Sequence, residues 1–301
     1  MLLTLISVVQ LGTVDYTTAL KLQQQLVALR KEEKIGDVLL LLEHKPVITL
    51  GRNAKAANVV ASPDFLTQRG VELFECDRGG DVTFHGPGQI VGYFIFDFRG
   101  LASPQGQRKT LGVIEFVRRL EDVLIRTCTD FEIPTKRLSG LTGVWTDPEA
   151  RNAGVGADAL VGAVERSSTT DENCPKAQGA VSAAAGGHAE AKLAAIGVHI
   201  SRFVTSHGFA LNVNTDLRYF NLIIPCGITS KPVSSMEKEL GRKLNLKAVA
   251  ESISRNFGTV FESSILWVDT LDALLGRAVG VPMQPPKQLR QLHKEDETNW
   301  A

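Results

Sequence analysis

The sequence predicts an α+β fold in which a mixed β-sheet is flanked by helices. Apolar runs of strand length and amphipathic stretches of helical spacing are interspersed, without the regular alternation of a doubly wound parallel sheet. The 301 residues are 44% hydrophobic and 22% charged, which is typical of a globular chain with a sizeable core. No apolar run reaches the roughly 18 residues that a membrane span requires.

Three stretches predict amphipathic helices. Residues 15–34 place leucines such as Leu22 and Leu26 at spacings of three and four, opposite a face of Gln, Lys, Arg and Glu. The same spacing predicts helices at 111–128 and 244–257. Shorter apolar runs predict strands at 1–11, 38–42, 47–50, 71–76, 89–98, 143–146, 193–201 and 209–213. The run 38–42 is apolar throughout, so we expect both of its faces to be covered.

Two segments differ in composition from the rest. Residues 147–191 are rich in Ala, Gly, Ser, Asp and Glu and contain almost no large apolar side chain, which predicts a disordered insertion. The tail after position 285 is polar, and we expect it to be disordered as well. We therefore predict one domain at 1–260, interrupted by the insertion, and a C-terminal extension at 261–301.

The charge and cysteine content exclude several kinds of function. The 33 basic and 33 acidic residues give no net charge, which removes the simplest case for nucleic acid or an anionic membrane as a partner. The four cysteines form no Cys-x-x-Cys pair, so neither a zinc site nor a thioredoxin-type redox motif is indicated. Four cysteines in a chain of this length also do not make a disulfide scaffold. A reducing compartment fits this usage best. No phosphate-binding loop of the Walker or dinucleotide type occurs.

The densest cluster of unusual residues is the glycine-rich loop 78–89, Arg-Gly-Gly-Asp-Val-Thr-Phe-His-Gly-Pro-Gly-Gln. Paired glycines allow backbone amides to approach a ligand closely, which suggests a loop that cradles substrate between Arg78 and His85. The alternative is a long hairpin turn whose glycines serve only its shape.

Cys226 and Lys192 are the candidates for nucleophilic chemistry. Cys226 follows a proline and precedes a glycine at a predicted corner, where a thiol is exposed and free amides can hold an oxyanion. Its alternative role is that of a small buried hydrophobe. Lys192 stands where the insertion ends; beside a thiol its ammonium would favour the thiolate, and otherwise it is a solvated surface charge. His44 and His207 are open to both functional and structural roles.

Taken together, these segments resemble the lipoyl(octanoyl) transferase family. The matching stretches fall in the family's order at 42–49, 78–89, 139–145, 192–197, 206–212 and 225–228. The loop motif combined with a downstream lysine and Pro-Cys-Gly-Ile is highly specific. The resemblance implies the fold of lipoate ligases and of the biotin protein ligase catalytic domain.

The resemblance also implies a reaction and its residues. Cys226 is expected to be the acyl-thioester nucleophile, and Lys192 to favour its thiolate. The substrate site is expected to consist of Arg78, Gly79, Gly80, Asp81, Val82, Thr83, Phe84, His85, Ala195, Ile196, Gly197, Gly208, Phe209 and Ala210. No cofactor and no metal are expected.

The implied reaction is the first step of endogenous protein lipoylation. The donor would be octanoyl-acyl carrier protein. The acceptors would be lipoyl domains of 2-oxoacid dehydrogenase complexes and the glycine cleavage H protein. We expect a monomer with no nucleic-acid or membrane partner. The insertion departs from the family's pattern and favours a eukaryotic, mitochondrial protein, although no transit peptide is visible; otherwise the protein is expected in the cytoplasm.

Three other functions remain open from the residues. An ATP-dependent lipoate or biotin ligase would share the fold but would not need Cys226. A cysteine thioesterase would combine Cys226 with His85 or His207 and release the acid to water. A non-enzymatic acyl-binding protein would use Cys226 only for packing.

Overall fold

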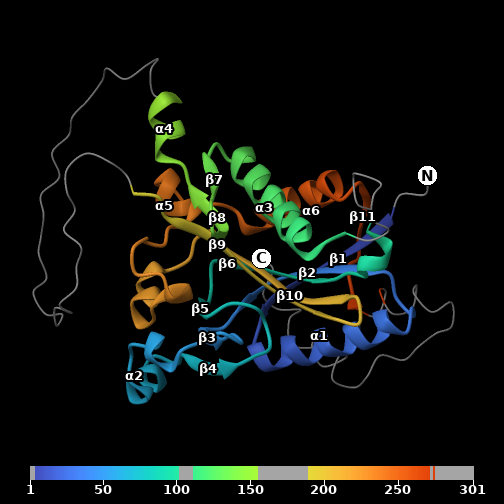
Figure 1. Ribbon diagram of the computed structural model, residues 1–301, viewed down its shortest axis with the longest axis horizontal. Coiled ribbons are helices and arrows are strands. Elements are labelled where there is room, and N and C mark those ends of the chain that lie inside the picture. The colour runs from blue at the N-terminus through green and yellow to red at the C-terminus, as the bar shows by residue number, and fades with distance from the viewer. Residues whose placement is uncertain (1–3, 102–110, 155–188, 272–273, 275–301) are drawn as a thin grey trace, which may run out of the picture.

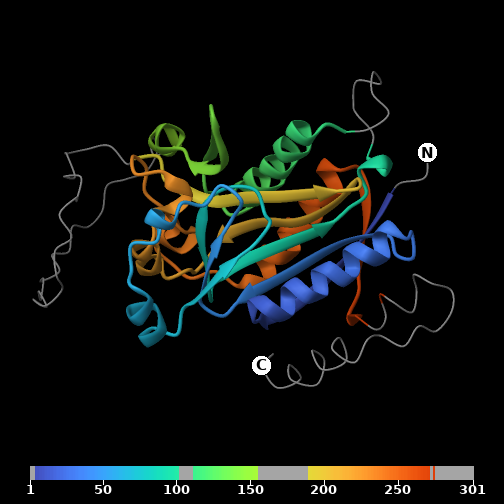
Figure 2. The same cartoon turned by 60° about the horizontal axis from the view of Figure 1, so that its bottom comes forward.

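A computed structural model describes residues 4–101, 111–154, 189–271 and 274 of the chain. Its centre is an eight-stranded mixed sheet with helices on both faces (Figures 1 and 2). The predicted α+β class with a mixed sheet is confirmed. Within the described residues, no helix is long and apolar enough to cross a membrane.

The large sheet has the strand order β11-β1-β2-β6-β10-β9-β8-β7. Its strands are β1 (Thr4–Val14), β2 (Asp37–His44), β6 (Gln89–Ile95), β7 (Thr135–Leu138), β8 (Leu141–Thr146), β9 (Lys192–Ser201), β10 (Val204–Asn212) and β11 (Ser263–Trp267). The pairs β11–β1 and β1–β2 are parallel, and the remaining pairs are antiparallel. A small second sheet has the order β4-β3-β5, from β3 (Val47–Leu50), β4 (Glu72–Glu75) and β5 (Val82–His85).

The helices lie around the two sheets. They are α1 (Tyr16–Lys31), α2 (Pro63–Gln68), α3 (Val113–Asp130), α4 (Pro148–Gly154), α5 (Met236–Leu240) and α6 (Leu246–Val260). Four short 3₁₀ turns complete the described elements: η1 (Ala56–Asn58), η2 (Phe98–Gly100), η3 (Leu217–Leu222) and η4 (Pro225–Gly227). In Figures 1 and 2, α1 lies on one side of the sheet and α3 and α6 on the other.

The position of β2 in the sheet explains why residues 38–42 are apolar throughout. Leu39 and Leu41 belong to the core under α3 and α6, whereas Val38, Leu40 and Leu42 belong to the core under α1. Successive side chains of a strand point to opposite faces, so a central strand covered by helices on both sides needs apolar residues at every position. The expectation that both faces of 38–42 are covered is confirmed.

The structure departs from the sequence-based predictions in several places, and it contains α2, β7 and α5, which were not predicted. Residues 82–85, expected within a glycine-rich loop, form β5, because Val82 and Phe84 alternate with polar residues and enter a core cluster. The start of the expected insertion is not disordered but forms α4, whose Arg151 bonds to Glu239. Most of the expected insertion and the polar tail lie outside the described residues. Beyond position 260, β11 pairs with β1 as an edge strand of the large sheet.

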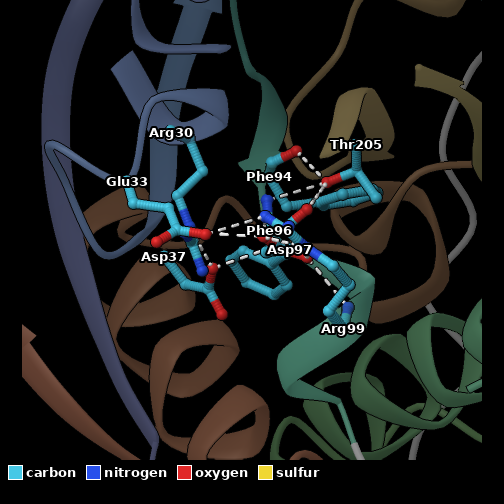
Figure 3. Close-up of polar contacts among 8 residues, drawn as sticks. All are labelled: Arg30, Glu33, Asp37, Phe94, Phe96, Asp97, Arg99 and Thr205. Carbon is cyan, nitrogen blue, oxygen red and sulfur yellow. Dashed lines mark hydrogen bonds and ion pairs between the residues drawn. The ribbon is translucent and has the colours of Figure 1, made fainter. Parts of the chain in front are cut away.

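A buried ionic network ties α1 to the sheet at the end remote from the loop 78–89 (Figure 3). Arg30 Nε donates to Asp37 Oδ1 at 2.8 Å, and its Nη1 lies 3.6 Å from Asp97 Oδ2. Asp37 Oδ1 also accepts the Asp97 backbone N–H at 3.0 Å. Burial raises the pKa of Asp37, and Arg30 opposes that rise. The network fixes the C-terminal half of α1 against β2.

We expect Arg30→Met to lower the free energy of unfolding by about 3 kcal/mol, because it leaves Asp37 buried without its cation. Urea denaturation measures this difference. Arg218→Met is the matched control, since Arg218 pairs with Asp216 while its own side chain is 84% exposed. Such an exposed pair is expected to change stability by less than about 1 kcal/mol. Equal losses in both variants would contradict the assignment.

Candidate active site

A cavity of about 370 Å³ lies over one face of the large sheet. Its floor is made by facing residues of three neighbouring strands: Val91 and Tyr93 on β6, Gly208 and Ala210 on β10, and Ala195 and Gly197 on β9. Most of these residues are small, so the sheet surface is hollow here. A cavity of this size is typical of a small-molecule or acyl-chain site.

The loop between β4 and β5, residues 76–81, forms the roof of the cavity and is called the roof loop below. Gly79 N donates to Val198 O at 3.1 Å, which lays the loop directly on β9. This approach requires glycine at position 197, because a Cβ there would lie 2.6 Å from Gly79 O. Gly79 of the loop and Gly197 of β9 therefore lie in direct backbone contact.

Arg78 fixes the shape of this roof. Its side chain is buried and donates to Thr49 O (2.7 Å), Thr49 Oγ1 (2.9 Å), Asp81 O (2.7 Å) and Gly79 O (3.0 Å). All four acceptors are neutral oxygens, so these bonds hold the loop without cancelling the guanidinium charge. The cavity wall consequently carries a positive charge.

Burial lowers the pKa of the histidines near this wall, which favours their neutral forms. Burial, together with the neighbouring His44 and Arg78, lowers the pKa of His85 well below its ordinary value. Burial also lowers the pKa of His44 to about 4 and lowers that of His207. His85 Nδ1 bonds to Gln89 Oε1 at 2.7 Å, and His207 Nε2 bonds to Asp77 Oδ1 at 2.6 Å. Each imidazole is thus engaged in holding part of the cavity wall.

Cys226 sits in the turn η4 beside the cavity. Its backbone has φ 57° and ψ 18°, the left-handed region that non-glycine residues rarely adopt. The turn is tethered by Ile224 N, which donates to Asn58 O at 2.7 Å. Asn58 Nδ2 in turn donates to Asp81 Oδ2 at 2.5 Å. The half-buried thiol is therefore held at the end of the roof loop.

Lys192 meets Cys226 directly. Its Nζ donates to Cys226 Sγ at 3.3 Å, although the two residues are 34 positions apart in the sequence. Lys192 is the first residue of β9, and its backbone is fixed by bonds to Pro232 O (2.8 Å) and from Ser234 N (3.0 Å). The structure therefore brings together the two residues predicted for nucleophilic chemistry.

Hydrogen bonds and ion pairs hold the two ends of the segment 147–191 together, next to Lys192 in the chain. Thr146 N donates to Ala191 O, and Ala191 N donates to Thr146 Oγ1, both at 2.9 Å. Lys136 Nζ lies 3.3 Å from Asp147 Oδ1 and 2.9 Å from Glu190 Oε1. These contacts hold the described residues on either side of the segment together and fix the backbone next to Lys192.

All of the predicted substrate-site residues line the cavity except Val82 and Phe84. These two point to the other side of β5, where the Phe84 ring stacks on Tyr219 with centroids 4.7 Å apart. Tyr16 and Tyr93 also line the cavity but were not predicted, because aromatic residues in amphipathic or apolar runs are indistinguishable from core residues.

A cavity on a mixed sheet with a lysine–cysteine pair at its wall defines a catalytic domain of the lipoyl protein ligase A/B class. The family model described as the lipoyl protein ligase A/B catalytic domain matches residues 15–258. The chain belongs to the octanoyltransferase family. An octanoyltransferase of Koribacter versatilis is 53% identical over 97% of this chain and 98% of its own length. One from Acidobacterium capsulatum is 47% identical over 90% of this chain and 96% of its own length.

Solved structures share the fold at low sequence identity. A bipartite lipoate protein ligase from Thermoplasma acidophilum matches with a TM-score of 0.61 and 12% identity, covering 97% of this chain and 93% of its own. A lipoate-protein ligase A bound with ATP matches with a TM-score of 0.58 and 11% identity, over 96% and 94% of the two chains. The eukaryotic, mitochondrial origin inferred from the insertion is not supported, since the Koribacter relative is bacterial and matches almost end to end.

We expect replacement of residues 155–188 by a flexible Gly/Ser linker of about ten residues to leave the site intact. The bonds between Thr146 and Ala191 and the Lys136 ion pairs hold the neighbouring chain ends without this segment. The measurement is the rate of Cys226 alkylation, read by peptide mass spectrometry, together with the unfolding midpoint. A folded variant with slowed alkylation would show that the segment contributes to the site.

The buried His44 predicts a loss of stability in acid. Its pKa is about 4 when folded and near 6.5 when unfolded, so the unfolded chain binds the proton first as the pH falls. The contribution is complete above pH 6.5 and disappears between pH 6.5 and 4, a loss of about 3 kcal/mol. His44→Gln cannot titrate, so its free energy of unfolding should fall correspondingly less over this range in urea denaturation. Equal slopes in the two proteins would refute the assignment.

Proposed function

We propose that this chain transfers an octanoyl group from octanoyl-acyl carrier protein to the acceptor lysine of a lipoyl domain, through a thioester on Cys226. The observation that carries the proposal is the 3.3 Å contact between Lys192 Nζ and Cys226 Sγ beside the cavity. A buried ammonium that donates to sulfur stabilises the thiolate, which is the nucleophilic form of cysteine.

In the first step, the Cys226 thiolate attacks the carbonyl carbon of the donor thioester. The new carbon–sulfur bond forms as the bond to the carrier's sulfur breaks, and that sulfur leaves as a thiolate. One thioester replaces another, so the step is nearly balanced in energy. Such an exchange needs no ATP, because the donor arrives already activated.

In the second step, the acceptor amine attacks the acyl carbon on Cys226. The carbon–nitrogen bond forms, the bond to Cys226 Sγ breaks, and the proton released by nitrogen returns to the departing sulfur. Lys192 is placed to stabilise the thiolate as it leaves. The amide product is much more stable than the thioester, which makes the transfer effectively irreversible.

The cavity supports an acyl substrate of medium length. Its floor carries small and apolar groups at Val91, Ala195 and Ala210, and its volume is about 370 Å³. Each buried methylene contributes about 0.8 kcal/mol, so the six methylenes of an octanoyl chain supply about 5 kcal/mol. That difference is sufficient to favour octanoyl over much shorter chains.

The contacts of the histidines favour transfer over hydrolysis. A cysteine thioesterase would use a histidine as the base of Cys226. His85 bonds to Gln89 and His207 bonds to Asp77, whereas the thiol receives its hydrogen bond from Lys192. A lysine ammonium stabilises a thiolate but does not activate water.

The partners and location follow from the same proposal. The acceptors would be lipoyl domains of 2-oxoacid dehydrogenase complexes and the glycine cleavage H protein. The bacterial relatives favour the cytoplasm as the compartment in which the chain encounters its donor and its acceptors. We propose that the chain acts as a monomer.

The test is the intact mass of the protein after mixing with octanoyl-acyl carrier protein in the absence of ATP. We expect an octanoyl adduct on the wild-type chain that an apo lipoyl domain discharges as an amide. Cys226→Ala should form none, whereas Cys76→Ala, which removes another half-buried free thiol, should form it normally. Lys192→Met should slow adduct formation roughly a hundredfold.

Three outcomes would overturn the proposal. Modification of the lipoyl domain only with ATP and free octanoate would identify a ligase. Release of free octanoate from the adduct in the presence of acceptor would identify a thioesterase. An adduct that persists in Cys226→Ala would place the nucleophile elsewhere.

A further inference from the structure

We propose that Trp145 is a positioning residue for Lys192, and that the face of its indole ring holds the ammonium against Cys226. The inference rests on the proposed function, in which Lys192 activates the thiol. Lys192 Nζ lies 5.0 Å from the centroid of the Trp145 ring, within the range of a cation–π interaction. Both side chains are buried, Trp145 to 1% exposure and Lys192 to 8%.

The charge of Lys192 needs such a partner. A buried ammonium is costly unless something compensates its lost hydration. Within the described part of the chain, no carboxylate forms an ion pair with Lys192, and its hydrogen-bond partner is Cys226 Sγ. A carboxylate would cancel the positive charge that stabilises the thiolate. An aromatic face attracts the ammonium without adding a negative charge, so the field at the sulfur is preserved.

A β-bulge places the two side chains opposite each other. In the β8–β9 ladder, Val144 pairs with Ala194, but the next residue, Trp145, pairs with Lys192 rather than with Leu193. The extra residue breaks the alternation of β9, and both Leu193 and Ala194 enter the same hydrophobic core. Without the bulge, Lys192 would point toward this core. With it, Lys192 shares the cavity face and faces Trp145 as its cross-strand partner.

Gly143 opens the path of the lysine side chain. Its φ is +121°, and a Cβ at this position would lie 2.9 Å from Lys192 Cε and 2.4 Å from Ala194 O. The buried carboxylate of Glu121 accepts the Gly143 N–H at 3.0 Å and holds this conformation. The strand β8 is therefore shaped to let Lys192 cross it, with Trp145 as the aromatic surface beneath the ammonium.

A tryptophan at position 145 leaves a buried donor unpaired within the described fold, and this energetic cost indicates that the indole serves a specific role. Among the residues that the structure describes, the buried Trp145 Nε1–H has no hydrogen-bond partner. A phenylalanine would fill an apolar site without leaving a buried donor unpaired. Indole, however, has the strongest cation–π attraction of the aromatic side chains. Attraction to the ammonium accounts for an indole where packing alone disfavours one.

The first test compares Trp145→Phe with Trp145→Leu in the full chain. The readout is the pH dependence of Cys226 alkylation by iodoacetamide, measured on the Cys226 peptide, which requires neither acyl donor nor acceptor. We expect Trp145→Leu to move the profile to higher pH and to slow alkylation at pH 7 about tenfold, whereas Trp145→Phe restores most of the rate. Phe116→Leu, a fully buried aromatic of the α3 core, is the packing control and should leave the profile unchanged.

The second test keeps the size of the side chain, so it does not require the fold to tolerate a smaller residue at position 145. Fluorinated tryptophans can replace all three tryptophans of the chain, which keeps the shape of the ring and weakens its attraction for cations. We expect the alkylation profile to shift to higher pH progressively with the number of fluorines. In a Lys192→Met background, the same series should produce no shift, because the cation is absent.

An alkylation profile that is indifferent to fluorination would overturn the proposal. An equal shift in Trp145→Leu and Phe116→Leu would do so as well, since it would indicate general loosening of the core. Because alkylation is measured without substrate, these outcomes are distinct from failure of the octanoyl transfer itself, which the adduct experiment detects.

Discussion

The contact between Lys192 and Cys226 is the constraint on which the rest of this site depends. A thiol and an ammonium that lie 3.3 Å apart must both be fixed, because the stabilisation of a thiolate falls quickly with distance. Lys192 is fixed by the large sheet, as the first residue of β9. Cys226 is fixed by a strained turn that hangs from Asn58 and Asp81. The contact therefore requires the turn of Cys226 to lie beside the first residue of β9 in the large sheet.

The roof loop joins these two supports. Arg78 closes the loop on itself and on β3 through bonds to carbonyl and hydroxyl oxygens, and Gly79 bonds to β9. The same loop supplies Asp81, which tethers the turn of Cys226 through Asn58. The roof and the nucleophile are therefore held by the same residues. The ionic network around Arg30, at the far end of the sheet, holds α1 in place without contributing to the cavity lining.

Much of this arrangement could be predicted from the sequence, and the remainder could not for physical reasons. The strand β2 contains a continuous apolar run and the helix α3 has a clear helical spacing of apolar residues, so both were predicted at the right place. The strand β5 was missed because its four residues lie between glycines, which usually mark turns. The meeting of Lys192 and Cys226 depends on strand order and on a one-residue bulge in β9, and neither leaves a local signature in the sequence. Resemblance to a family pointed to both residues, whereas periodicity alone pointed to neither.

The shared fold separates two ways of making the same bond. The lipoate-protein ligase A with a matching fold is bound with ATP, and the likeness at 11% identity is one of architecture. In the proposed reaction the donor is a thioester, whose energy is sufficient to form an amide. The chain then needs only to pass the acyl group from one sulfur to another and on to nitrogen. A single thiol beside one unneutralised ammonium meets that need, and the hollow sheet surface beneath holds the acyl chain while the two carriers exchange places.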